Sequence, residues 1–250
     1  MQTINTRRSI RRYQDKDVDN TLLTRLIKEA ERTQTMGNLQ LYSVVVTRSE
    51  ELKAKLAPAH FNQPMVTGAP VVLTFCADYR RTTLWAEQRQ ATPGYDNPLS
   101  FVNAMTDALL FCQTFCNLAE EEGLGCCFLG TTVYQPQSII DTLQLPELVF
   151  PVATITLGWP DENPPLSDRL PVSTIIHEET FHDYSAADID KAYAYKEQLD
   201  ENKEFVKINN KQTVAQVFTD CRYTKADCEA MSETLLEALR KQKFLKEALR

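Results

Sequence analysis

The sequence predicts one α+β domain with a peripheral C-terminal part. Two apolar runs, PVVLTFCA at 70–77 and FPVATITLG at 150–158, have the length and composition of strands buried on both faces. Between them, residues 99–122 are nearly apolar on all sides as far as Phe115, which is typical of a helix at the centre of a fold. Helical and strand periods alternate along the chain without an internal repeat, and this pattern favours a single mixed domain.

The other elements follow from capping residues and periodicity. Residues 20–32 place their leucines on one helical face, behind an N-cap at Asp19 or Asn20. Residues 41–47 are rich in β-branched side chains and predict a strand, after which Ser49 caps a short helix that ends near Leu56. Gly123 is the expected C-cap of the central helix. We further expect a surface excursion over 80–97, a turn after 126–130, a helix over 135–143, a proline-rich loop over 159–171, an exposed helix or arm over 187–204, and an amphipathic helix over 224–244.

Composition narrows the class of protein. The chain has 250 residues, of which 43% are hydrophobic and 24% charged, and its formal net charge is −7. This acidic balance argues against a nucleic-acid-binding protein, whose basic residues would cover a whole face. No run approaches the roughly 18 apolar residues that a membrane span needs, and no signal-peptide core follows Met1, so we expect a soluble cytoplasmic protein. The seven cysteines lack disulfide spacing and are expected to be reduced, with Cys112 and Cys116 in the core.

The usual motifs of side-chain catalysis are missing from the sequence. GLGCCFLG at 123–130 does not match the dinucleotide fingerprint G-x-G-x-x-G, and there is neither a P-loop nor a G-x-S-x-G elbow. His177 and His182 are five residues apart, so on a helix they would point about 140° from each other and could not share a metal. We therefore expect no metal site, no catalytic side chain, and a reaction carried by a bound cofactor.

Four arginines, Arg7, Arg8, Arg11 and Arg12, stand close together near the start of this acidic chain. A transit peptide is disfavoured because three aspartates follow at once. From the cluster alone two interpretations stay open, a solvated run of charge without a ligand and a site for one local anion.

Several motifs, taken in order, resemble those of the FMN-dependent nitroreductase family. They are TRRSIR at 6–11, TQTMGNLQ at 33–40, FCAD at 75–78, GLG at 123–125, LGWP at 157–160 and RLP at 169–171. The sequence is most similar to the larger, oxygen-insensitive, NADPH-preferring group, from about Thr6 to His177. The resemblance implies a nitroreductase-like fold with a central, mostly antiparallel sheet flanked by helices, a C-terminal arm and a homodimer. It divides the chain into an FMN-binding core over 1–180 and a C-terminal helical extension over 181–250.

The resemblance also assigns the anion to the phosphate of FMN. A guanidinium suits this dianion because it offers paired, charge-assisted hydrogen bonds in a fixed geometry. In the family, the positions that match Arg7, Arg8, Ser9 and Arg11 hold the phosphate and ribityl chain or reach the flavin ring. Arg169, in the late proline-rich loop with Ser167, is implied to reach the same phosphate. The further positions implied to contact FMN are Gln34, Thr35, Met36, Gln63, Phe128, Leu129, Gly130 and Thr131.

The sequence departs from the family pattern in three places. Ser167 stands where a lysine is usual, Val133 where an arginine is expected, and Thr131 where the turn has its second glycine. Lys207 and Lys211 lie in the segment that corresponds to the stretch that grips the extra phosphate of NADPH, although solvated lysines without a ligand are the favoured interpretation. NADPH is the expected electron donor and NADH the alternative.

The implied function is hydride transfer from NAD(P)H through flavin N5 to nitroaromatics, quinones or flavins, by a ping-pong two-electron mechanism. Ene-reduction, dehalogenation and a non-redox flavin-binding role are alternatives on the same fold. The implied partners are a second copy of the chain and small-molecule acceptors, without nucleic acid or membrane.

Overall fold

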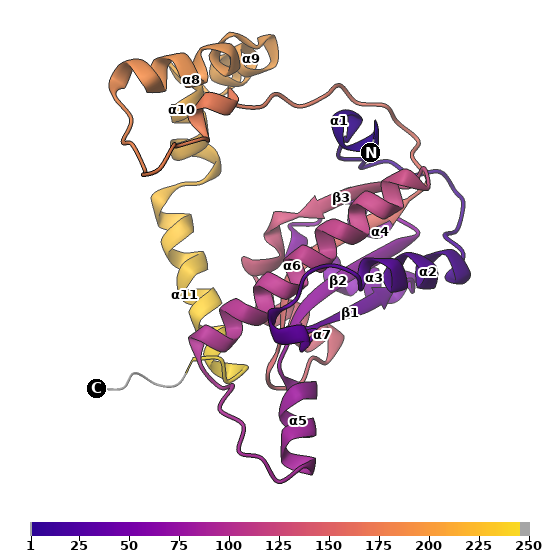
Figure 1. Cartoon of the computed structure of the whole chain (residues 1–250). Coiled ribbons are helices and arrows are strands. Elements are labelled where there is room, and N and C mark those ends of the chain that lie inside the picture. The colour runs from indigo at the N-terminus through magenta and orange to yellow at the C-terminus, as the bar shows by residue number, and fades with distance from the viewer. Residues whose placement is uncertain (1, 246–250) are drawn as a thin grey trace. The chain divides into compact units, whose positions relative to one another are not determined.

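The computed structural model describes residues 2–245, with the side chains of residues 4–245 (Figure 1). The chain divides into two compact units. The first unit comprises Met1–Pro165 and Met231–Arg250, and the second comprises Leu166–Ala230. The predicted division into an FMN-binding core over 1–180 and a C-terminal extension over 181–250 is a functional division and stays a prediction.

A four-stranded antiparallel sheet forms the centre of the first unit. Its strands are β1 (Tyr42–Thr47), β2 (Val71–Asp78), β3 (Gly125–Leu129) and β4 (Val149–Gly158), in the order β1-β2-β4-β3. Every residue of β2 and β4 is buried, as expected for apolar runs covered on both faces. The antiparallel sheet in an α+β fold is confirmed. The sequence analysis assigned no strand to 126–130, because this short run of cysteines between glycines lacks the β-branched residues that mark strands.

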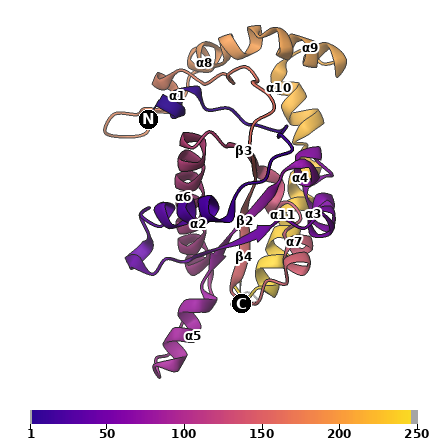
Figure 2. The same ribbon diagram turned by 90° about the vertical axis from the view of Figure 1, so that its right-hand side faces the viewer.

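Helices cover both faces of the sheet (Figure 2). On one face lie α2 (Asn20–Ala30) and α6 (Pro98–Glu121), and on the other lie α3 (Glu50–Leu56), α4 (Pro64–Gly68) and α7 (Pro136–Leu143). The N-terminal caps predicted for α2 and α3 are present, since the Asp19 carboxylate accepts from the amides of Thr21 and Leu22 and the Ser49 hydroxyl accepts from Leu52 N. Gly123 follows α6 with a φ of 82°, as expected of a glycine that ends a helix.

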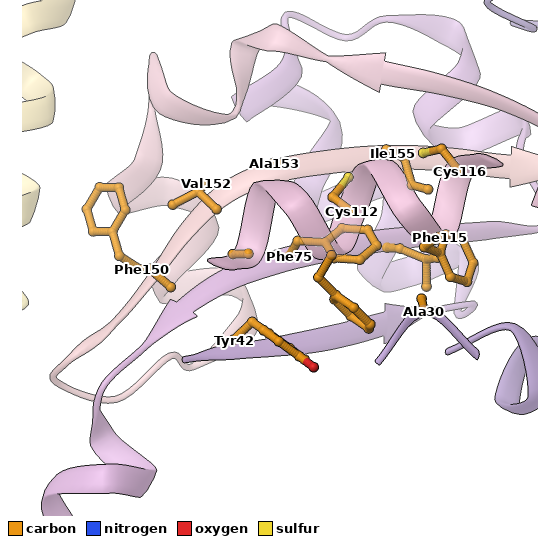
Figure 3. Packing of buried hydrophobic residues seen from close by; sticks show 14 of the residues in the cluster. Ala30, Tyr42, Phe75, Cys112, Phe115, Cys116, Phe150, Val152, Ala153 and Ile155 are labelled. Carbon is orange, nitrogen blue, oxygen red and sulfur yellow. The ribbon is translucent and has the colours of Figure 1, made fainter. Parts of the chain in front are cut away.

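The core lies between the sheet and the pair α2 and α6. Phe75, Phe111, Phe115 and Ile155 are among its fully buried side chains, and Figure 3 shows the cluster around Phe75, Cys112, Phe115 and Ile155. By length and composition α6 is the single helix within residues 2–245 that could cross a membrane, yet Phe111 and Phe115 on it are buried in this core. The predicted central position of this helix is confirmed.

The remaining elements are short or peripheral. The predicted surface excursion contains a helix, α5 (Arg80–Gln88), and the exposed segment of the second unit is two helices, α8 (Ala186–Gln198) and α9 (Asp200–Ile208). The C-terminal helix α11 (Lys225–Lys241) begins in the second unit and ends in the first. The other elements are α1 (Gln2–Thr6), α10 (Val214–Val217), the 3-10 turns η1 (Met36–Asn38), η2 (Ala57–His60), η3 (Gly130–Val133) and η4 (Val172–Thr174), and the π turn η5 (Phe218–Arg222).

Candidate functional site

The arginine-rich segment lies along strand β3. Ser9 forms a parallel bridge with Cys126, and Ile10 N donates a hydrogen bond of 3.0 Å to Cys126 O. The approach is close because Gly125 has no side chain, since a Cβ there would lie 2.7 Å from the Ile10 Cβ. The sheet edge therefore fixes the backbone from which the arginine side chains extend.

The four guanidinium groups differ in their partners. Arg7 lies 3.7 Å from Glu120, and Arg12 lies 3.7 Å from Glu162. Arg8 donates instead to main-chain oxygens, at 2.8 Å to Thr6 and 2.6 Å to Pro164. For residues 4–245, no ion pair with a carboxylate involves Arg8 or Arg11. Two positive charges are thus left available for an anion.

Two carboxylates border the same place. A pocket of about 320 Å³ is lined by Arg7, Arg8, Glu120 and Glu162 among others. Glu162 accepts hydrogen bonds from the amides of Arg11 and Arg12, at 2.5 and 3.1 Å, and these bonds lower the pKa of its carboxyl. Burial raises the pKa of Glu120 to about 7, against the opposing effect of Arg7. Glu162 therefore holds the main chain at Arg11 and Arg12, whereas Glu120 would compete with a bound anion for the guanidinium of Arg7.

The loop with Gln34, Thr35 and Met36 is anchored to the central helix. Asp107 is buried in α6, and its carboxylate accepts from Met36 N at 2.8 Å and from Leu41 N at 3.1 Å. The side chains of Gln34 and Met36 remain exposed. The helix thus fixes the backbone of this loop and leaves its side chains free to meet a ligand.

A third group of predicted residues lies at the end of β3. Phe128 is 54% exposed although the other residues of β3 are buried. Leu129 is buried, Gly130 is exposed, and the Thr131 hydroxyl lies 2.9 Å from Nδ1 of His60. An exposed phenyl ring on a short buried strand is an apolar surface on which a planar ring system could rest.

His60 is the residue that the sequence analysis missed. It ends the turn η2, three residues before Gln63, and its side chain is completely buried. The sequence offered only a weak signal, a lone histidine between a predicted helix and a predicted strand. The replacement of a family glycine by Thr131 was noted, but nothing in the sequence indicated that these two residues meet.

Comparison with known proteins decides the family. The nitroreductase family model matches residues 4–159. The chain belongs to the nitroreductase family. The resemblance read from the sequence motifs is thereby confirmed.

The alignments with known relatives cover most of this nitroreductase and most of each relative. The FMN reductase [NAD(P)H] of Bacillus subtilis is 32% identical over 220 residues, covering 85% of this chain and 86% of that protein. The oxygen-insensitive NADPH nitroreductase of Salmonella typhimurium is 30% identical, covering 78% of each protein. A crystal structure of an oxidoreductase from Bacteroides fragilis is 60% identical, with a TM-score of 0.97, and covers 98% of this chain and 100% of that one.

The match to the nitroreductase family model ends at residue 159. The candidate residues Ser167, Arg169, Lys207 and Lys211 come after it in the sequence and lie in the second unit. Arg169 is exposed, and its guanidinium donates to the main-chain oxygens of Ser167 at 3.4 Å and Asp168 at 2.8 Å. Lys211 forms an ion pair of 3.1 Å with Asp220, and Lys207 lies 3.9 Å from Glu204 with 80% of its side chain exposed. The roles of these four candidate positions stay predictions from the resemblance.

Proposed function

We propose that this nitroreductase is an FMN-dependent oxidoreductase that takes electrons in pairs from NAD(P)H and passes them to small acceptors such as nitroaromatics or quinones. The observation that carries the proposal is the edge of β3. There, the segment with Arg8 and Arg11, whose guanidinium groups have no carboxylate partner within residues 4–245, lies along the same strand that exposes Phe128. The name of the Bacillus subtilis relative, an FMN reductase, favours free flavin as a further acceptor.

The residues of the first unit fit the two chemically different parts of FMN. A phosphate dianion needs fixed positive charge, which Arg8 and Arg11 supply without first breaking an ion pair. Burial raises the pKa of the Cys127 thiol in β3, and the nearby Arg11 charge opposes this rise, which indicates that the guanidinium lies close to the strand. A flat ring needs an exposed apolar surface, which Phe128 provides. The late residues Arg169 and Ser167 are proposed to add to the phosphate contacts.

The protein's part in the reaction is positioning and electrostatics. FMN, when bound, supplies the two-electron chemistry between nicotinamide and acceptor. The main-chain N–H groups of Gly130 and Thr131 are proposed to donate towards the ring, and Gln63 to contact it. The loop of Gln34, Thr35 and Met36, held by Asp107, is proposed to line the ribityl chain.

Lys207 and Lys211 are proposed to bind the extra phosphate of NADPH. Lys207 lies near Glu204 and Lys211 near Asp220, and the hydrogen bond that the Lys211 ammonium donates to the Asp220 carboxylate raises the pKa of Lys211. A phosphate must therefore replace these carboxylates, which leaves a small energetic advantage over NADH at such exposed sites. NADPH is accordingly the proposed donor, and NADH is proposed to work less well.

A homodimer, working in the cytoplasm, is proposed as the active form. The helix α6 exposes an apolar stripe at helical spacing, with exposures of 70% for Leu99, 48% for Val102, 37% for Leu109 and 41% for Leu110. Such a stripe on a helix whose opposite face is in the core is a surface that a second copy of the chain could cover.

The first experiment is the visible spectrum of the purified protein before and after adding NADPH or, separately, NADH. Flavin bands that bleach with a nicotinamide and return with a nitroaromatic or quinone are the expected result. A colourless protein that takes up no added FMN would contradict the proposal. Bands that never bleach would point to the non-redox role instead.

The arginine site is tested with Arg11→Gln. Losing one charge-assisted hydrogen bond of 1.5–3 kcal/mol is expected to weaken FMN binding by about 10-fold to 100-fold, measured by fluorescence titration of the apoprotein. Arg32→Gln is the matched control, because Arg32 is exposed beyond the end of α2 and is no candidate for the site. Equal affinities for the two variants would remove Arg11 from the phosphate site.

A further inference from the structure

His60 is a buried polar side chain for which the proposed reaction has no use. Its exposure is 0%, and burial lowers the pKa of the imidazole to about 4, so the ring is neutral at physiological pH. Nδ1 lies 2.9 Å from the Thr131 hydroxyl, whereas Nε2 is buried without a hydrogen-bond partner among residues 4–245. Burying the His60 imidazole with Nε2 unsatisfied costs free energy. The hydrogen bond between Nδ1 and the Thr131 hydroxyl offsets part of this cost.

The hydrogen bond joins two segments that carry proposed flavin contacts. His60 ends η2 and precedes Gln63, whereas Thr131 lies in η3 directly after β3. The same segments meet a second time, where the rings of Phe61 and Tyr134 lie 6.2 Å apart. Alanines of η2 also share a buried apolar cluster with Leu129 of β3. The two segments are thus packed against each other, and the His60–Thr131 hydrogen bond is a polar contact between them.

The backbone between His60 and Gln63 adopts an unusual conformation. Phe61 and Asn62 have φ values of 54° and 52°, in the left-handed region that a phenylalanine rarely enters. Main-chain hydrogen bonds from Phe61 N and Asn62 N to Ala57 O hold this turn, the latter at 2.8 Å. Such conformations persist when the surroundings determine them, and this turn begins directly after the buried His60 and ends directly before Gln63.

We propose that His60 is a positioning residue, whose hydrogen bond to Thr131 sets the distance between Gln63 and the turn Gly130–Val133 on which the flavin ring rests. The inference rests on the proposed function. It also gives a reason for Thr131, because a glycine at this position would offer His60 no side-chain partner. A neutral ring performs this role without adding charge beside the cofactor.

The test compares variants that remove or keep the hydrogen bond. Thr131→Val removes the hydroxyl at similar size, and Thr131→Ser keeps it. His60→Phe removes the ring nitrogens, and His60→Asn places an amide where Nδ1 lies. The measurement is the anaerobic rate of flavin bleaching by NADPH at saturating concentration, together with FMN affinity and the thermal midpoint.

Thr131→Val is expected to slow bleaching about 10-fold, because small errors in the position of reacting groups reduce rates strongly. FMN affinity is expected to change about twofold or less, and Thr131→Ser and His60→Asn are expected to restore most of the rate. The double variant Thr131→Val with His60→Phe is expected to be no slower than the slower single variant, since both remove the same contact.

Thr74→Val is the control for this substitution, because it makes the same change at a fully buried threonine of β2 whose hydroxyl has no partner among residues 4–245. Its bleaching rate is expected to equal that of the wild type. If His60 variants do not fold, the Thr131→Val and Thr131→Ser pair decides the matter, since Thr131 is half-buried.

Two failures can be told apart. A wild-type protein that bleaches normally while Thr131→Val bleaches at the same rate would overturn the positioning role and leave the proposed function intact. A loss of thermal stability in Thr131→Val without any change in rate would also overturn it, since it would show a merely structural bond. A wild-type protein that binds FMN but bleaches with neither nicotinamide would overturn the proposed function itself, and this inference with it.

Discussion

At the scale of single residues, the guanidinium of Arg7 forms an ion pair with Glu120 and is also a candidate to bind the FMN phosphate. The Glu120 side chain is 11% exposed, and its Oε1 has no hydrogen-bond partner among residues 4–245. Desolvation dominates over the attraction of Arg7 and raises the pKa of Glu120 from 4.5 to about 7. Between these two values the folded state binds more protons than the unfolded chain, so the contribution of Glu120 to stability is lost as pH rises through 7.

The residue-scale prediction uses Glu120→Gln, which cannot ionise. After allowance for solvent screening, the ionised carboxyl is expected to cost about 1 kcal/mol at pH 8, or roughly 2–4 °C in thermal midpoint. The midpoint of the variant minus that of the wild type should therefore increase by this amount from pH 5 to pH 8, measured on the apoprotein by thermal unfolding. A difference that stays constant over the range would show that Glu120 has an ordinary pKa.

Sequence reasoning at this scale identified charges better than contacts. The arginine cluster was visible because four arginines within six residues are conspicuous in an acidic chain, and its place along β3 agrees with a single anion site. The ion pair of Arg7 with Glu120 and the hydrogen bond of His60 with Thr131 join residues 113 and 71 positions apart. No local pattern announces such pairs, because they depend on how the whole chain packs.

At the scale of elements, the site depends on how closely the arginine segment approaches β3. Gly125→Ala would place a Cβ 2.7 Å from the Ile10 Cβ, where two backbone-fixed groups must separate. We expect a loss of about 1–3 kcal/mol in the free energy of unfolding, as for other overpacked sites. FMN affinity should fall as well, because Ile10 lies between Ser9 and Arg11. Both effects are measured by chemical unfolding and by flavin titration.

Gly94→Ala is the control for this substitution. A Cβ at Gly94 meets nothing within 4 Å, and its backbone is not in the left-handed region. We expect unchanged FMN affinity and a change in stability of less than about 1 kcal/mol. Loss of stability in Gly125→Ala without loss of FMN affinity would separate the packing of Ile10 from the cofactor site.

Elements with a strong pattern were predicted, and those defined by their neighbours were not. The long α6, the buried strands β2 and β4, and the caps of α2 and α3 follow from apolar runs and from Asp19 and Ser49. Strand β3 was missed because its five residues obtain their strand geometry from pairing with β4, from Gly125 with Gly158 to Leu129 with Thr154. The helix α5 was hidden in a polar stretch that has no continuous apolar face.

At the scale of the whole molecule, the exposed stripe on α6 is an apolar surface that a second copy of the chain could cover. The opposite face of α6 contacts the core through Phe111 and Phe115, so the helix cannot turn its exposed leucines inward. Leu109 and Leu110 therefore stay in water unless a second chain covers them. Leu110→Glu, which puts a charge in this stripe, is expected to convert the proposed dimer to a monomer of 28.5 kDa, measured by light scattering.

The same variant shows whether the dimer matters for the cofactor. If FMN lies at the interface between two copies, Leu110→Glu should lose flavin colour together with the proposed dimer. Val46→Glu is the control, because Val46 is similarly exposed at 40% but lies on β1, and it should keep both. A monomeric wild-type protein that still binds FMN would show that one chain is sufficient for the site. A dimeric Leu110→Glu would instead assign the interface to a different surface and leave the stripe without a role.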